Sequence, residues 1–260
     1  MSLSILTNIS AMNTQQNLLK SSNAVSTSMS RLSSGLRINS AADDAAGYAI
    51  SQGLTSQVNG LNQASSNTND AISMVQTASS SLNDVQNMLQ RVYELGVQYN
   101  NGSNSSTDKA DIQSEVNQLT QEIDRQKTSS NFNGLNLLDG SAGTSGTVTF
   151  QVGANAGDSL TATFSSIEGN SGLGGLGFSW ASATTGGTVI DLSNASALTS
   201  VTNAINNISS MAATLGAVQN RLQYTSDSIS STEQNLSASN SQIKDVNMAQ
   251  EMTNMTQEQI

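Results

Sequence analysis

The sequence contains no cysteine, no histidine and no proline. Without cysteine the chain has no disulfides, no thiolate nucleophile and no thiolate-ligated metal. Without histidine it has no imidazole base and no histidine-ligated zinc site. Without proline it has no residue that breaks long helices, and no prolyl isomerisation slows refolding. These absences predict a protein that is not an enzyme, with no catalytic residues, no cofactor and no metal ion.

Charged residues are also scarce, at 11% of the chain against about 25% in typical domains. The net charge of −10 disfavours nucleic acid and anionic membrane surfaces as partners. Most coiled coils carry Glu and Lys on their outer faces, whereas this chain carries Ser, Thr, Asn and Gln. Uncharged polar groups cost less to bury than charges when they are hydrogen-bonded. Two interpretations stay open: faces that pack against other copies, or a hydrophilic extracellular surface.

Long hydrophobic runs are missing as well. No stretch approaches the ~20 apolar residues of a membrane span, so we expect no membrane insertion. Residues 1–10 lack a basic region and a continuous apolar block. They are therefore not expected to form a cleavable signal peptide.

The most regular pattern lies towards the carboxyl end, where every seventh residue is large and aliphatic. A strict seven-residue apolar repeat favours helices that supercoil around each other. It predicts one helix over residues 191–247, roughly 55 residues and about 85 Å long at 1.5 Å per residue. The row comprises Val201, Ile208, Leu215, Leu222, Ile229, Leu236 and Ile243.

A second long helix is predicted over residues 43–98. Large aliphatic residues recur along one row, and alanines recur three positions later, so another helix can approach closely. This helix is the natural partner of the one over 191–247. Ser40, three residues before Asp43, is expected to cap its start. The predicted bundle seam is Leu54, Leu61, Val75, Leu82 and Leu89 against Val201, Ile208, Leu215, Leu222 and Ile229.

Two shorter helices are predicted. Residues 3–36 have amphipathic spacing, with Gly35 as the expected stop, and such a terminal helix needs a partner helix to stay ordered in water. Residues 107–127 are expected to fold back antiparallel on the second helix and to complete a three-helix bundle. The apolar row of this return helix is Ile112, Val116, Leu119 and Ile123.

The segment over 128–190 differs in kind because most of the glycines lie there. Residues 147–152 and 159–164 alternate with period two and predict a β-hairpin closed by the loop between them. Residues 131–138 are expected to add an irregular strand. The stretch 169–187, with the only tryptophan, Trp180, is expected to be a loop or a small variable lobe.

Three motifs were considered as sites. The sequence GLGGLG at 172–177 matches a dinucleotide-binding pattern, but no strand precedes it and no helix follows, which favours a turn. The pair Asp43 and Asp44 fits the positive end of a helix dipole better than a metal site. Arg91 is expected to pair with Glu94 or Glu115, and to share a helix face with Leu95 at i+4.

Three stretches closely resemble bacterial flagellin, the filament subunit of the flagellum. They are SRLSSGLRINSAADDAAG at 30–47, NFNGLNLL at 131–138 and IKDVNMAQEM at 243–252. With the connecting helices the resemblance covers about 1–140 and 190–260. The middle matches no specific pattern, as expected for the family's variable, outward-facing region.

The predicted fold is mainly α: a long coiled-coil-like helical bundle with a small β-hairpin-containing region inserted in the middle. The resemblance divides the chain into five segments. They are an N-terminal filament-core helix (1–42), the N-terminal half of the bundle (43–130), the hairpin and glycine-rich variable outer region (131–190), the long C-terminal bundle helix (191–244) and the start of the C-terminal filament-core helix (245–260).

The resemblance implies a structural subunit that assembles with copies of itself through its terminal helices, for motility. It implies an extracellular location and export without a cleaved signal, with a flagellar secretion chaperone, cap and hook-junction proteins as partners. Residues 90–98 resemble the segment that the vertebrate innate flagellin receptor reads. On that likeness Arg91, Leu95 and Glu115 would be the contacts, although Tyr93 and Gly96 depart from the family's pattern.

Family members continue past Ile260 with further apolar turns. Without them the partner surface for residues 3–36 is incomplete, so this chain is expected to be monomeric or to polymerise poorly. The main alternative function is a flagellin-like cell-surface protein that binds a glycan or a host surface through residues 140–190. A hook–filament junction protein is disfavoured by the match at 30–47. A flagellin with a protease insert would need a histidine-containing metal motif, which the sequence lacks.

Overall fold

A computed structural model of the protein describes residues 8–167, 190–194 and 196–260. The GLGGLG motif at 172–177 and Trp180 lie outside these described residues. The chain divides into two compact units, which are taken separately below. The terminal unit is Met1–Asn62 with Ser231–Ile260, and the bundle unit is Gln63–Ser230.

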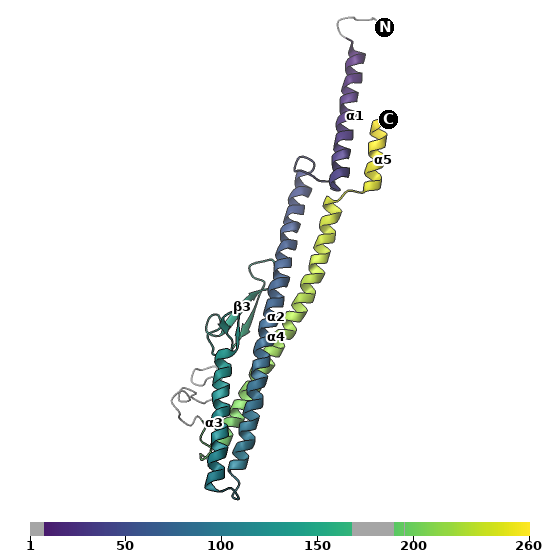
Figure 1. Cartoon of the computed structure of the whole chain (residues 1–260). Coiled ribbons are helices and arrows are strands. Elements are labelled where there is room, and N and C mark those ends of the chain that lie inside the picture. Colours follow the sequence, from purple (N-terminus) through teal and green to yellow (C-terminus); the bar gives the residue numbers. More distant parts are fainter. Residues whose placement is uncertain (1–7, 168–189, 195) are drawn as a thin grey trace. The chain divides into compact units, whose positions relative to one another are not determined.

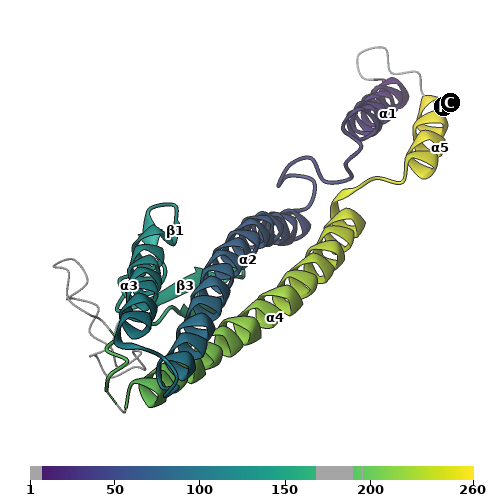
Figure 2. The ribbon, with the colours of Figure 1, turned by 60° about the horizontal axis from the view of Figure 1, so that its bottom comes forward.

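The bundle unit contains most of helix α2 (Ala45–Tyr99), all of α3 (Ser106–Ser129) and most of α4 (Ala197–Lys244). Figures 1 and 2 both show α3 beside the second half of α2, with α4 following α2 on another side. A continuous apolar core joins the three helices, with Leu82 and Leu89 from α2, Ile123 from α3, and Ile208 and Leu222 from α4. The mainly α fold with a hairpin region between its helical ends is therefore confirmed.

Six of the predicted seam residues belong to this core: Val75, Leu82, Leu89, Ile208, Leu215 and Leu222. All ten predicted seam residues are buried except Leu54, which is half-buried. Leu236 and Ile243, further along the row of α4, are half-buried as well. The alanines of the second row, Ala64, Ala71 and Ala78, are fully shielded. Their small size allows the close helix approach that the pattern indicated.

The start of the long C-terminal helix differs from the sequence prediction. Helix α4 begins at Ala197 instead of residue 191. The Asp191 carboxylate accepts the backbone N–H of Ser193 at 2.9 Å, and the Asn194 amide oxygen accepts that of Ser196 at 3.1 Å. These local turns compete with the helix for the same backbone donors, and they delay its start.

Helix α3 begins with a capping box that the sequence analysis missed. The Ser105 hydroxyl oxygen accepts the backbone N–H of Asp108 at 3.2 Å, and the Asp108 carboxylate accepts the backbone N–H of Ser105 at 2.9 Å. Each side chain satisfies a backbone donor that the first helical turn leaves free. The reciprocal pair therefore fixes where the return helix begins.

The predicted hairpin is confirmed as β3 (Thr147–Gln151) paired antiparallel with β4 (Ser159–Thr163). Leu160 and Ala162 of β4 face the bundle core, and the Asn67 amide of α2 donates to the Gln151 carbonyl at 3.0 Å. The alternation of β4 therefore places its apolar face on the helices and its Ser and Thr residues in solvent.

Residues 131–138 form a second, smaller hairpin instead of a single irregular strand. Strand β1 (Asn131–Phe132) pairs with β2 (Leu135–Asn136). Asn133 and Gly134 between them both have positive φ, at 49° and 80°. That is the requirement of a tight two-residue hairpin turn, and the Asn-Gly dipeptide meets it.

The terminal unit contains α1 (Ile9–Ser34), α5 (Met248–Gln259), the first turns of α2 and the last turns of α4. Helix α1 ends where predicted: Gly35 is left-handed, with φ 73°, and its N–H donates to the Arg31 carbonyl. Helix α1 packs against α5, so the partner helix that the sequence required comes from the opposite end of the chain.

Candidate assembly surface

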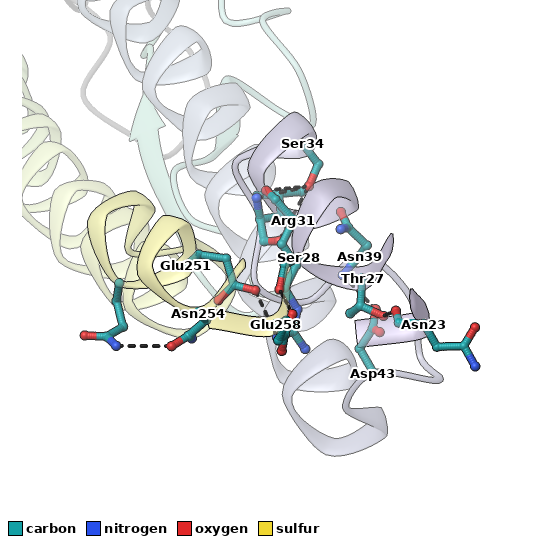
Figure 3. Close-up of polar contacts among 12 residues, drawn as sticks. Asn23, Thr27, Ser28, Arg31, Ser34, Asn39, Asp43, Glu251, Asn254 and Glu258 are labelled. Carbon is teal, nitrogen blue, oxygen red and sulfur yellow. Dashed lines mark hydrogen bonds and ion pairs between the residues drawn. The ribbon is translucent and has the colours of Figure 1, made fainter. Parts of the chain in front are cut away.

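Polar side chains contribute to the contact between α1 and α5. The Arg31 guanidinium lies 3.5 Å from the Glu251 carboxylate, and the Ser28 hydroxyl donates to the Glu258 carboxylate at 3.2 Å. Ser28 and Glu251 are both buried. Figure 3 shows these side chains pointing toward one another between the two helices. A buried charge is tolerated only when it is paired, so Arg31 fixes how α5 lies on α1.

Large apolar side chains lie exposed along α1 and α5. Ile9 is 71% exposed, Leu18 68% and Leu19 55%. Met12 and Met29 of α1 are exposed as well, together with two methionines of α5, Met248 and Met252. A helix pair in a globular domain normally buries its large apolar residues. Exposed apolar side chains gathered on one pair of helices are characteristic of a surface that another protein chain covers.

The connectors beside this pair are tied to each other. Leu36 and Asp245 form an isolated β-bridge, in which the Arg37 N–H donates to the Lys244 carbonyl at 2.7 Å and the Val246 N–H donates to the Gly35 carbonyl at 3.0 Å. The chain leaving α1 is thus held to the chain leaving α4, although the two segments lie far apart in the sequence.

Arg37 also caps the end of α4. Its guanidinium donates to the Ile243 carbonyl at 2.6 Å and to the Gln242 carbonyl at 3.2 Å. Carbonyls in the last turn of a helix have no partner within it and carry partial negative charge, so a cation there is stabilising. The capping role of Arg37 could not be predicted from the sequence, because no residue spacing relates position 37 to position 243.

The loop before α2 is organised by two adjacent carboxylates with separate tasks. The Asp43 carboxylate accepts the backbone N–H groups of Ser40 at 2.9 Å and Asn39 at 3.1 Å, and these bonds hold the pKa of Asp43 below its ordinary value. The Asp44 carboxylate accepts the N–H groups of Ala46 and Gly47. Asp44 therefore caps α2, and the prediction of Ser40 as the cap is wrong because Asp43 holds Ser40 in the preceding turn.

Gly47 makes this loop compact. An added Cβ at Gly47 would lie 2.4 Å from an oxygen of Asp44 and 2.7 Å from the δ-methyl of Ile38. Ile38 is itself buried. Only a residue without a side chain lets the loop close over the first turn of α2.

In the bundle unit, Arg91 pairs with both candidate partners at once. Its guanidinium lies 2.9 Å from Glu115 and 3.3 Å from Glu94. Arg91 and Glu115 are about half exposed, so the structure brings these two predicted contact residues together on the surface. Leu95 differs: it is 1% exposed and packs in the core with Val92. The predicted shared face of Arg91 and Leu95 is wrong, because Leu95 continues the apolar row of α2.

Within the described ranges, no group of three or more acidic side chains is arranged to hold a metal ion. None of the described helices combines the length and the apolar character needed to cross a bilayer.

The chain matches two family models at its ends. The bacterial flagellin N-terminal helical region matches residues 5–143, and the bacterial flagellin C-terminal helical region matches residues 198–260. A flagellin of Halalkalibacterium halodurans is 39% identical over 254 residues, covering 97% of this chain and 89% of that protein. The flagellar filament 33 kDa core protein of Treponema phagedenis is 41% identical over 261 residues, covering 97% of this chain and 90% of that protein.

One solved structure, described as a flagellar hook-associated protein from Vibrio parahaemolyticus, aligns with a TM-score of 0.63 at 14% identity. The alignment covers 78% of this chain and 100% of that one. At this identity the likeness concerns the fold alone.

Proposed function

The chain belongs to the bacterial flagellin family and is a structural subunit of the flagellar filament, and we propose that it assembles through the exposed apolar side chains of α1 and α5. The observation that carries this proposal is the set of large apolar side chains that α1 and α5 leave exposed. Other copies of the chain are the natural cover for this surface, since a filament places the same face of every subunit in an equivalent contact.

The energetics favour this use of the surface. Burying one large aliphatic side chain completely stabilises an interface by about 1.5–3 kcal/mol. Leu18 and Leu19 each keep more than half of their surface in water, so each would contribute a substantial part of that amount. The Arg31–Glu251 pair, in which Arg31 is 31% exposed and Glu251 9%, adds little net energy, but it would favour one geometry for the two helices, and therefore one shape for the interface.

A seeded sedimentation experiment tests the proposal. The double variant Leu18→Ser with Leu19→Ser removes apolar surface from α1 without touching the contact with α5. We expect it to lose attachment to short flagellin filament seeds. The control, Gln15→Ser with Asn17→Ser, changes exposed polar residues of the same helix and should attach as the unaltered chain does. Attachment of the double variant at the unaltered level, with helical content retained, would contradict the proposal.

The same assay without seeds measures unseeded growth of filaments by the chain. Attachment to seeds and unseeded growth are separate readouts, so one can fail without the other.

Family membership also motivates proposals about partners and export. We propose that a secretion chaperone, the filament cap and the hook-junction proteins bind this chain, and that it reaches the cell exterior without losing an N-terminal leader. The intact mass of the chain recovered from culture medium tests the second point. A mass lower than that of the sequence by an N-terminal segment would contradict it.

The Arg91–Glu115 pair is the proposed contact for a vertebrate innate receptor of flagellin. Its exposure supports this role, whereas Leu95 would act from beneath by packing α2. In a receptor reporter assay, Arg91→Ala should lower the response. Arg125→Ala, which removes a comparable exposed pair with Glu122, is the matched control. Equal responses from both variants would contradict the proposal.

The glycan- or host-binding alternative is not favoured, because the relatives that align along nearly the whole chain are flagellins and a filament core protein. Its proposed sugar-binding residue, Trp180, lies outside the described residues.

A further inference from the structure

The methionines of this chain divide sharply between the two units. In the terminal unit, Met12 is 56% exposed, Met29 57%, Met248 47% and Met252 55%. Met255 on the same helix is half-buried, and Met1 lies outside the described residues. All four exposed methionines lie on α1 or α5, the two helices of the proposed assembly surface.

In the bundle unit the methionines are less exposed. Met74 is 3% exposed, and Met88 and Met211 are partly buried and pack against the core. All three residues are less exposed than the four methionines named above. Oxidation of a thioether depends on access of the oxidant to the sulfur, so the fold sorts the described methionines by accessibility, from the exposed four through the half-buried ones to the buried Met74.

The composition gives these sulfur atoms added importance. The chain has nine methionines but no cysteine, so no thiol competes for a two-electron oxidant. With a hydroperoxide, the sulfur lone pair attacks the terminal peroxide oxygen and the O–O bond breaks. One oxygen atom is transferred, giving methionine sulfoxide and water from hydrogen peroxide. The sulfur loses two electrons and the peroxide gains them.

We propose that Met12, Met29, Met248 and Met252 form an oxidation site, and that their conversion to sulfoxides by hydroperoxide prevents the free subunit from joining a filament. The proposal rests on the assembly role proposed above for α1 and α5. A sulfoxide is polar and accepts hydrogen bonds. Burying it against an apolar face without a donor would cost the desolvation of that oxygen.

Assembly would protect the same residues. A subunit already in the filament has this surface covered by its neighbours, so peroxide cannot reach the sulfur atoms. The free subunit is therefore the sensitive form, and the assembled subunit is the resistant one. Methionine sulfoxide reductases can reverse the modification, which would make this a reversible block on incorporation.

The first experiment maps the modification with hydrogen peroxide on the folded full chain, followed by peptide mass spectrometry over time. We expect the four exposed methionines to oxidise at least ~10-fold faster than Met74, as their accessibility predicts. Met88, Met211 and Met255 should react at intermediate rates. Similar rates for Met74 and the exposed four would overturn the proposal.

The second experiment measures attachment to filament seeds after peroxide treatment, as a ratio to attachment before it. The unaltered chain should show a large loss. A variant with all four exposed methionines replaced by leucine keeps apolar volume but has no oxidisable sulfur there, so its ratio should stay near one. A variant with Met74→Leu, Met88→Leu and Met211→Leu should remain as sensitive as the unaltered chain.

The outcomes separate this proposal from the assembly role. If the untreated chain does not attach to seeds, the assembly role is wrong. The oxidation rates measured by peptide mass spectrometry do not depend on that result. If the untreated chain attaches and the fully oxidised chain attaches equally well, the oxidation block alone is wrong. Equal sensitivity of the four-leucine variant and the unaltered chain would also overturn the block.

Discussion

Leucines of the bundle core and leucines of the terminal helix pair have opposite surroundings. In the bundle unit, Leu82, Leu89 and Leu222 are fully buried between α2, α3 and α4. In the terminal unit, Leu18 and Leu19 of α1 lie mostly in water, while charged and hydroxyl groups lie between α1 and α5. Under the assembly role proposed above, the first set serves folding and the second set serves association with other chains.

The sharpest test of this difference is to truncate one leucine in each unit. Leu89→Ala should lower the free energy of unfolding by about 2–5 kcal/mol, because it opens a cavity in a closed core. Leu19→Ala should change it by no more than about 0.5 kcal/mol, while weakening attachment to filament seeds. Urea denaturation followed by circular dichroism measures the first effect. Equal destabilisation by the two substitutions would remove the distinction between the units.

Two glycines of α2, Gly47 and Gly53, offer a matched pair of substitutions within the terminal unit. Gly47→Ala should destabilise the loop before α2 by about 1–3 kcal/mol, because the added methyl would collide with Asp44 and Ile38. Gly53→Ala meets no atom within 4 Å and should stabilise the helix by about 0.5–1 kcal/mol. Hydrogen exchange over residues 38–55 reports both changes. Similar protection in the two variants would mean that the loop tolerates the methyl group.

The polar contact of the terminal pair can be broken directly. Glu251→Gln would leave Arg31 without its counter-charge, and should weaken the packing of α5 on α1 by about 1–2 kcal/mol. Faster amide exchange along α5 would be the sign of this. Glu122→Gln in the exposed pair with Arg125 is the control, and should change stability by less than about 1 kcal/mol. Unchanged amide exchange along α5 would show that other contacts hold this helix on α1.

The smallest expected effect concerns pH and the start of α3. Hydrogen bonds from the Ser105 hydroxyl and backbone N–H lower the pKa of Asp108. Because the folded pKa lies below the unfolded one, the stabilisation is complete above the unfolded value of about 3.9 and is lost as the pH falls through the folded pKa. The protection factors of the amides at 105–109, which correct exchange for its intrinsic pH dependence, should therefore fall in acid. The substitution Asp108→Asn should flatten this pH dependence. An unaltered dependence in that variant would show that titration of Asp108 is not its cause.

Periodic features of the fold were predictable from the sequence. The seven-residue row of α4 and the row of α2 predicted two paired helices because each position repeats the same physical requirement. Alternation of apolar and polar residues predicted the β3–β4 hairpin. Gly35 predicted the end of α1, since a left-handed terminus favours glycine.

Features set by single hydrogen bonds were not predictable in the same way. Asp44 and Ser40 are both good helix caps, and only the geometry of Asp43 decides between them. The turns at Asp191 and Asn194 take backbone donors that a periodic pattern assigns to the helix. Leu95 could have been assigned to the core, because it lies three residues after Val92, but its i+4 spacing from Arg91 and the resemblance at 90–98 placed it on the exposed face.

The contact of Arg37 with the end of α4 has a consequence for mutational tolerance. Its guanidinium binds main-chain carbonyls of Gln242 and Ile243, which are present whatever side chains stand there. Exchanges at those two positions can therefore leave this joint intact, whereas lysine in place of Arg37 would bring a compact, strongly hydrated ammonium group in place of a guanidinium whose Nη2 now donates to both acceptors. The two sides of one contact thus differ in how freely their residues can vary.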